Sequence, residues 1–151
     1  MALKVGDPAP DFTLPSTAGT SFTLSRDTAG QSVVLAFYPG DFTPICTAEM
    51  CSFRDGFDGL KDLGVPVYGI SRDDIATHDK FRATHRLPFH LLSDPDYTVL
   101  KAFGLFVPLL VRFQRITLLL DVTHNIAAIH DNPLASAGHL RQMIKALQAR
   151  K

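Results

Sequence analysis

One apolar run constrains the fold more than any other feature of this sequence. It reads Val33-Val-Leu-Ala-Phe-Tyr38 and is ended by Pro39 and Gly40. Six consecutive residues of this kind, rich in β-branched and aromatic side chains, are typical of a strand that is buried on both faces. The run therefore predicts a central strand in a sheet that is covered on both sides.

A helix is expected soon after this strand, and strands and helices then alternate. Thr43 and Pro44 have the character of an N-cap and a first helical residue, since proline costs nothing where no N–H is needed. This element order predicts an α/β sandwich with a mixed central sheet flanked by helices, in one domain over residues 1–151. The expected hairpin strands are 11–14 and 21–24; the later strands are 66–70, 90–92, 116–120 and 126–130; and the helices are 43 to about 59 or 64, 75–85, 98–103 and 137–150.

Composition narrows the class of protein. The 151 residues hold 15 Lys and Arg against 15 Asp and Glu, a balance that argues against a nucleic-acid or anionic-membrane surface. The most apolar stretch, 102–120, is interrupted by polar residues and falls short of a membrane span. The first residues do not read as a secretory signal, so a cytoplasmic location is expected. There the two cysteines would stay reduced and free for chemistry.

The first cysteine has a position that favours reactivity. With Pro44 as the first helical residue, Cys46 is the third, where free N–H groups and the helix dipole favour a thiolate. Lowering a thiol pKa from ~8.5 to ~6 takes about 3.4 kcal/mol. A helix terminus usually supplies about 0.3 to 1 kcal/mol and at best ~2 kcal/mol. A nearby cation is therefore required, and Arg112 and Arg115, before the strand at 116–120, are the candidates.

These residues resemble the peroxiredoxin family. The string Pro39-x-x-x-Thr43-x-x-Cys46 is similar to the family's proline, threonine and peroxidatic cysteine. Glu49 matches the acidic residue three positions later, and Arg115 matches the family's later arginine. Two further segments also look like the family's, so the resemblance covers nearly the whole chain: Val5-Gly-Asp-Pro-Ala-Pro-Asp-Phe12 and Leu92-Ser-Asp94.

The resemblance implies a thioredoxin-like fold and a thiol peroxidase that needs no bound cofactor and no metal. Cys46 would attack a hydroperoxide and become a sulfenic acid, with release of water or an alcohol. Thr43 and Arg115 would donate hydrogen bonds to the leaving oxygen. Pro39, which has no N–H, would wall the site, and Glu49 would orient Arg115.

The second cysteine decides the subclass. Cys51 follows Cys46 by five positions, a spacing that resembles the PrxQ or bacterioferritin comigratory protein group, in which a resolving cysteine sits there. On an intact helix the two Cα atoms would be about 8.7 Å apart, beyond the ~7 Å that a disulfide tolerates, so the helix must open. Thioredoxin or a glutaredoxin-like dithiol would then reduce the bond.

Two alternatives stay open. Cys51 can be a structural residue, which would make the chain a one-cysteine peroxidase. A protein of a different class, a redox-sensing interaction or holdase module, would use the same thiol only to detect oxidant.

Two departures from the family pattern affect the site. Ile45 stands where the PrxQ-like group commonly has glycine before the cysteine, which bears on access and on unwinding. The segment 104–113 is unusually apolar. It can pack onto the core, form a homodimer interface or wall a site for organic hydroperoxides, so the chain is expected to be a monomer or a homodimer.

The histidines do not show a metal-binding pattern. His78 and His85 lie two helical turns apart, which is too far to share an ion, and both are expected at the surface.

Overall fold

The computed structural model describes residues 3–42, 44–55, 64–107, 116–130 and 145, and for residues 44–46 and 49 it describes the backbone alone. Strands and helices alternate through most of this part of the chain. In chain order they are β1 (Thr13–Pro15), β2 (Ser21–Thr23), α1 (Leu24–Asp27), β3 (Val33–Phe37), α2 (Pro44–Asp55), β4 (Val67–Ser71), α4 (Ile75–His85), β5 (Leu91–Ser93), α5 (Thr98–Ala102), β6 (Ile116–Leu120) and β7 (Ile126–His130).

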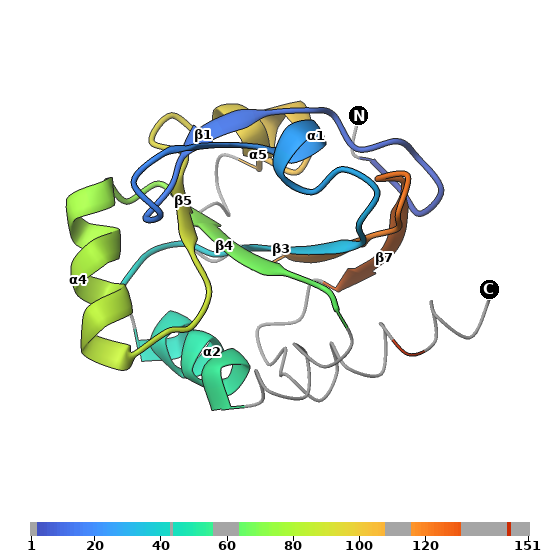
Figure 1. Ribbon diagram of the computed structural model, residues 1–151. Helices are drawn as coiled ribbons and strands as arrows, with labels where there is room; N and C mark the ends of the chain where they lie inside the picture. The colour runs from blue at the N-terminus through green and yellow to red at the C-terminus, as the bar shows by residue number, and fades with distance from the viewer. Residues whose placement is uncertain (1–2, 43, 56–63, 108–115, 131–144, 146–151) are drawn as a thin grey trace.

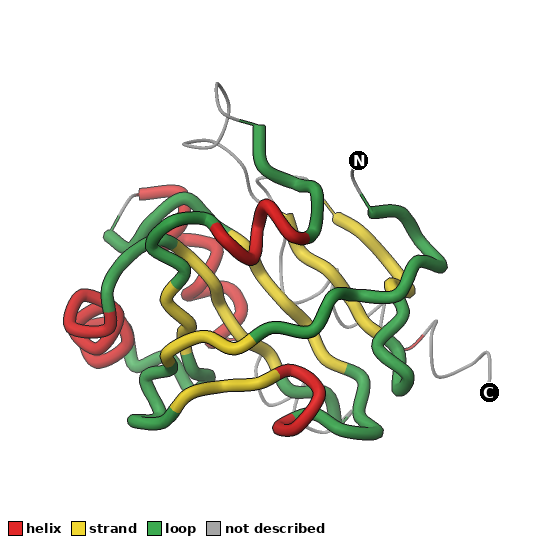
Figure 2. The backbone as a smooth tube through the Cα atoms, turned by 90° about the horizontal axis from the view of Figure 1, so that it is seen from above, coloured by secondary structure: helices red, strands yellow, loops and turns green. Residues whose placement is uncertain are grey.

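The strands form an antiparallel hairpin, β1 with β2, and a mixed sheet of order β5-β4-β3-β6-β7. β3 runs parallel to β4, and β4 to β5, whereas β6 and β7 are antiparallel additions. The hairpin, α1 and α5 cover one face of the sheet, and α2 lies against the other (Figure 1). α4 lies along the β5 edge, as the view from above shows (Figure 2). The predicted mixed α/β sandwich with an N-terminal hairpin is confirmed.

The apolar run 33–38 forms β3 and the residue after it, and its side chains face two cores. Alternate side chains of a strand point to opposite faces, so every second residue joins the same core. Val33, Leu35 and Phe37 pack under the hairpin and α5, and Val34, Ala36 and Tyr38 pack under α2 and α4. A strand with an apolar layer on each side reads as an uninterrupted run, which is the pattern that the sequence shows.

Helix α2 is seated closely on the sheet. Met50 and Phe53 of this helix are fully buried in the core that it shares with α4. The same core is closely packed at Gly69 of β4. A Cβ at this position would lie 2.7 Å from Leu91 Cδ2 and 3.2 Å from Tyr38 Cε1, both too close, and at an ordinary contact distance of 3.6 Å from Met50 Sδ.

Most predicted elements agree with the structure to within one or two residues, and the strands 116–120 and 126–130 and the helix 75–85 agree at both ends. One assignment was wrong, because Leu24 begins α1 instead of ending β2. The Thr23 N–H donates to Asp27 Oδ2 at 2.7 Å and closes this short turn. The predicted helix over 137–150 lies outside the described residues, as does any continuation of α2 over 56–63.

The apolar segment after α5 packs partly against the core at Leu105 and Phe106, whereas Val107 is 41% exposed. The Phe106 ring lies 5.3 Å from the ring of Tyr97 and 4.8 Å from Lys101 Nζ. Residues 108–113 lie outside the described part, so the interface and substrate-wall interpretations stay predictions. Among the helices that the structure describes, none has the length and apolar character that crossing a bilayer requires.

Candidate active site

The connection from β3 to α2 carries the predicted site. β3 ends at Phe37, and Pro44 is the first residue of α2, as predicted. Cys46 is therefore the third residue of the helix, in its first turn, where unpaired N–H groups lie. Pro39 follows the strand and is half-buried. Thr43 lies outside the described residues, and of Glu49 the structure describes the backbone within α2.

The predicted arginine precedes a strand that pairs with β3. Ile116 opens β6 and lies opposite Phe37, the last residue of β3. Arg115 and Arg112 themselves lie outside the described residues. The register nevertheless brings the start of β6 to the sheet end from which the connection to α2 departs.

Cys51 lies in the same helix as Cys46. It is a free thiol and is half-buried. α2 is continuous from Pro44 to Asp55, so both cysteines belong to one unbroken helix. Ideal helix geometry then separates their Cα atoms by about 8.7 Å, which no disulfide can span.

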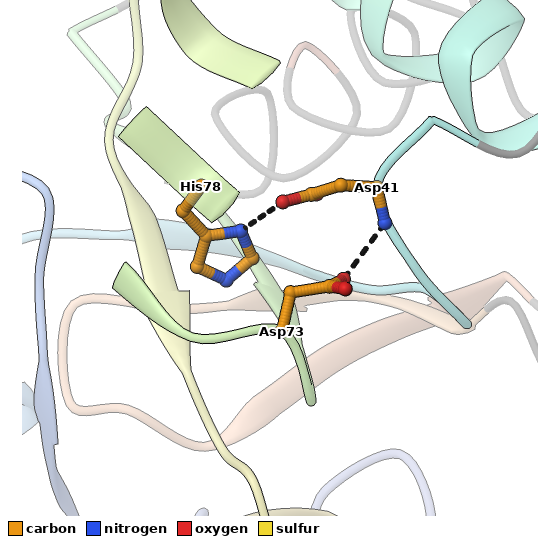
Figure 3. Close-up of side chains that lie close together, drawn as sticks. All are labelled: Asp41, Asp73 and His78. Atoms are coloured by element: carbon orange, nitrogen blue, oxygen red, sulfur yellow. Dashed lines mark hydrogen bonds and ion pairs between the residues drawn. The ribbon is translucent and has the colours of Figure 1, made fainter. Parts of the chain in front are cut away.

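A buried hydrogen-bond network centres on Asp41, between β3 and α2. The Tyr38 hydroxyl donates to Asp41 Oδ1 at 2.6 Å, and His78 Nδ1 lies 2.6 Å from Asp41 Oδ2. The Asp41 N–H donates to Asp73 Oδ2 at 2.7 Å, and His78 Nε2 lies 3.0 Å from the Leu92 carbonyl oxygen. Figure 3 shows the Asp41, Asp73 and His78 side chains converging from the β3–α2 loop, the β4–α4 loop and α4. The network ties four parts of the chain together.

The surface position expected for His78 was wrong, because its side chain is fully buried beside the equally buried carboxylate of Asp41. The sequence held a signal for this burial. His78 is three residues from both Ile75 and the buried Phe81, so all three share one face of α4. Its partner could not be foreseen, since Asp41 lies 37 positions earlier. His85 is half-buried, with its ring 5.1 Å from that of Phe81.

The polar side chains of this network are engaged in hydrogen bonds within the protein. Burial raises the pKa of Tyr38 well above its usual value, and the nearby Asp41 raises it further, so the phenol stays protonated and donates. Asp41, Asp73 and His78 offer atoms within 4.8 Å of one another that could ligate a metal ion. Both carboxylate oxygens of Asp41 and both ring nitrogens of His78 already have protein partners. Sequence reasoning missed this cluster.

Helix α2 is also tied to α4 at its far end. Arg54 Nη1 donates to the carbonyl oxygen of His85, the last residue of α4, at 2.8 Å. Arg54 Nε lies 2.9 Å from Asp55 Oδ1 in an ion pair whose acidic partner is exposed. A cation at a helix C-terminus satisfies a carbonyl that has no partner within the helix. α4 is therefore bonded both to the loop that precedes α2, through Asp41, and to the last turn of α2, through Arg54.

Comparison with known proteins decides the family. The family model described as the AhpC/TSA family matches residues 5–129 of the chain. The chain belongs to the AhpC/TSA family. A putative peroxiredoxin bcp of Coxiella burnetii is 40% identical over 154 residues, covering 97% of this chain and 100% of the relative.

Solved structures agree with this assignment. Peroxidoxin BcpB from Mycobacterium tuberculosis superimposes with a TM-score of 0.85 at 32% identity and covers 99% of both chains. The bacterioferritin comigratory protein of Xanthomonas campestris, studied for its alkyl peroxide reduction activity, gives a TM-score of 0.81 at 29% identity and covers 97% of this chain and 99% of its own. The expected thioredoxin-like peroxiredoxin fold and the resemblance to the PrxQ group are thus confirmed. Peroxiredoxins are peroxidase oxidoreductases, so this chain is an enzyme.

Proposed function

We propose that this peroxiredoxin reduces hydrogen peroxide and organic hydroperoxides with Cys46 as the attacking thiolate and Cys51 as the resolving thiol. The observation that carries the proposal is the position of Cys46 in the first turn of α2, directly after the strand and loop that match the family signature. The alkyl peroxide reduction activity named for the Xanthomonas campestris relative supports the organic substrates.

The first step is a two-electron transfer from sulfur to oxygen. The Cys46 thiolate attacks the terminal oxygen of R–O–OH, an S–O bond forms and the O–O bond breaks. The products are the Cys46 sulfenic acid and RO⁻, which takes a proton and leaves as an alcohol, or as water when the substrate is hydrogen peroxide. Sulfur is oxidised and the peroxide is reduced, so no metal or organic cofactor is required.

The Cys46 thiolate needs more stabilisation than a helix terminus gives. About 3.4 kcal/mol is required to lower a thiol pKa from ~8.5 to ~6, and the dipole supplies at best ~2 kcal/mol. We assign the remainder to Arg115. Arg115 is the residue of the family pattern that comes directly before Ile116 in the sequence, and Ile116 is paired with Phe37, the last residue of β3.

The remaining site residues have supporting roles in the proposal. The Thr43 hydroxyl and the Arg115 guanidinium donate hydrogen bonds to the oxygen that gains negative charge as the O–O bond breaks. Pro39 is half-buried beside the end of β3 and walls the site without offering an N–H of its own. Glu49 orients Arg115 through a charge-assisted contact.

Cys51 completes the cycle in the two-cysteine scheme. Its thiol attacks the sulfenic sulfur of Cys46, an S–S bond forms and the oxygen leaves as water. Met50 and Phe53, on either side of Cys51, are fully buried, so the part of α2 before Met50 is the part that must unwind. An external dithiol, thioredoxin or a glutaredoxin-like protein, then reduces the disulfide to two thiols and is itself oxidised.

Coupled turnover with thioredoxin, its reductase and NADPH tests the scheme. The wild type should consume NADPH when peroxide is added, and Cys46→Ser should have no activity. Cys51→Ser should undergo one rapid oxidation but lose thioredoxin-supported cycling. Normal cycling by Cys51→Ser would refute the two-cysteine scheme.

Thiol counting after one equivalent of peroxide separates the alternatives. Loss of both thiols supports the resolving role of Cys51, and loss of one supports a one-cysteine peroxidase in which Cys51 is structural. The half-buried position of Cys51 between two buried core residues is the feature that favours a structural role. A sensing or holdase module would instead be oxidised slowly and stoichiometrically, with no turnover when the reductant is supplied.

Location and assembly are further parts of the proposal. We propose a cytoplasmic location, in line with two cysteines that must start each cycle reduced. The chain would be a monomer or a homodimer, and gel filtration at several protein concentrations distinguishes the two.

A further inference from the structure

Asp41 lies inside the segment that leads into the active site. It stands between Pro39 and Thr43, three residues before the start of α2, yet its side chain is fully buried. Three hydrogen bonds hold this one residue: to the Tyr38 hydroxyl, to the His78 ring and, through its own N–H, to Asp73. Loops ordinarily run over the surface, so a connection fixed by a buried carboxylate is unusual.

The groups around His78 define where its protons lie. The Leu92 carbonyl can only accept a hydrogen bond, so His78 Nε2 carries a hydrogen. At 2.6 Å, one further proton lies between His78 Nδ1 and Asp41 Oδ2. With the Tyr38 hydroxyl donating to the other oxygen, every strong hydrogen-bonding position of the pair is used. Removing either partner would leave a buried polar group without a partner, which is costly.

Asp73, which accepts the hydrogen bond from the Asp41 N–H, is itself held by hydrogen bonds. Asp73 Oδ2, which accepts from the Asp41 N–H, also accepts from the Ser71 hydroxyl at 2.6 Å. The Ser93 hydroxyl donates to the Asp73 carbonyl oxygen at 2.7 Å. Asp73 is therefore held by the ends of β4 and β5, so the loop that contains Asp41 is attached to the rigid sheet.

The next residue shows that this turn is held under strain. Phe42 has φ 63°, a left-handed conformation that costs energy for a bulky side chain. Its ring is half exposed and packs edge-on against Phe81, 5.1 Å away, and lies 6.1 Å from His85. Strained residues of this kind persist only where the surroundings fix them, and they concentrate at functional sites. Buried Asp41 on one side and α4 on the other supply that constraint.

We propose that Asp41 and His78 are positioning residues for the peroxidase reaction: their buried pair fixes the turn between Pro39 and Thr43 and thereby aims the first turn of α2 at the peroxide. The inference rests on the proposed role of Cys46. It gives His78 a function in a reaction whose atoms it does not touch. A misplacement of 1 Å by a residue remote from the chemistry can cost about a hundredfold in rate.

Two substitutions at position 41 separate geometry from bulk stability. Asp41→Ala removes both side-chain bonds. Asp41→Asn can restore them, because its amide oxygen accepts from Tyr38 and its NH₂ donates to the Nδ1 lone pair of neutral His78. A matched control is Asp74→Ala, which removes the exposed N-cap of α4, a 2.8 Å bond to the Thr77 N–H, and leaves the β3–α2 loop alone.

The measurement is the second-order rate constant for the reaction of the reduced, full-length protein with hydrogen peroxide. The chain contains no tryptophan, so the rate is best obtained by competition with a haem peroxidase that is followed by its own absorbance. We expect Asp41→Ala to react about ten to a hundred times more slowly than wild type. The rate constants of Asp41→Asn and Asp74→Ala should stay within about threefold of the wild-type value. This change is smaller than the tenfold factor that corresponds to one pKa unit.

A second readout responds to positioning and not to stability alone. In the Cys51→Ser background, the pH profile of Cys46 alkylation by iodoacetamide reports how well the thiolate is stabilised. Asp41→Ala should move its midpoint to higher pH, and Asp41→Asn should restore it. If Asp41→Ala does not fold, Tyr38→Phe removes one bond of the same carboxylate and should shift both readouts in the same direction.

The outcomes distinguish this inference from the function on which it rests. A wild-type protein that does not react with peroxide overturns the proposed function and this inference together. A reactive wild type with an equally fast Asp41→Ala, or with Asp74→Ala impaired as much as Asp41→Ala, overturns the positioning role alone. Slow Asp41→Ala with rescue by Asp41→Asn supports it.

Discussion

The packing of Leu91 and Tyr38 around Gly69 predicts that this glycine cannot be enlarged without cost. A methyl group at this position would meet Leu91 Cδ2 at 2.7 Å and Tyr38 Cε1 at 3.2 Å. Leu91 is fully buried, so it has little room to move away. Overpacking a core costs about 1–3 kcal/mol, and replacing glycine by alanine within a strand returns about 0.5–1 kcal/mol.

The net effect of Gly69→Ala is therefore a loss of between about 0 and 2.5 kcal/mol in the free energy of unfolding, with the middle of the range at ~1 kcal/mol. For a protein of this size, each 1 kcal/mol lowers the melting temperature by about 2–4 °C. Urea unfolding followed by far-UV circular dichroism measures the first quantity, and a thermal scan of the same samples checks the second.

A double-mutant cycle with Leu91→Ala tests the cause. Leu91→Ala alone should cost about 2–5 kcal/mol through the cavity that it leaves. In the double variant the new methyl group enters that cavity. The losses of the two single variants should therefore sum to at least ~1 kcal/mol more than the loss measured for the double variant. Additive costs, or a Gly69→Ala protein more stable than wild type, would refute the explanation of this glycine by close packing.

Two further predictions concern carboxylates outside the site. Asp94 is 3% exposed and accepts hydrogen bonds from the Val99 and Leu100 N–H groups at 3.0 and 3.2 Å. Asp94→Ala should therefore lower the free energy of unfolding by about 1–3 kcal/mol, and Asp94→Asn should recover part of this loss. An unchanged urea midpoint for Asp94→Ala would contradict this. The Ser25 hydroxyl lowers the pKa of Asp11, so the stability from this contact is present at neutral pH and decreases as the pH falls below about 4. Ser25→Ala should be less stable than wild type at pH 7, and the difference between their urea midpoints should narrow as the pH is lowered into the acid range; a difference that does not change with pH would contradict this.

The fold was largely predictable because its signals are local. The uninterrupted apolar run of β3 reports two covered faces, and Pro44 marks the start of α2 because only the first turn tolerates proline. α1 was missed because its local signal is too weak. Leu24 continues the alternation of β2, and a single helical turn is too short to show a helical period.

The candidate site was predictable only in part. Cys46 and Pro39 lie close together in the sequence with a recognisable spacing. Arg115 lies outside the described residues, so its role stays a prediction. The Asp41 and His78 pair was not found, because it joins residues 37 positions apart and no local spacing indicates that these two side chains meet. Taken separately in the sequence, an aspartate in a loop and a histidine in a charged helix are both expected to be exposed to solvent.

The most direct test of the central claim is to trap the sulfenic acid. The reduced Cys51→Ser protein is treated with one equivalent of hydrogen peroxide in the presence of dimedone, digested and mapped by mass spectrometry, with Cys46→Ser treated in parallel. We expect a dimedone adduct on Cys46 in the first protein and no rapidly formed adduct in the second. An adduct on Cys51 of the Cys46→Ser protein at a comparable rate, or an unmodified Cys46, would contradict it.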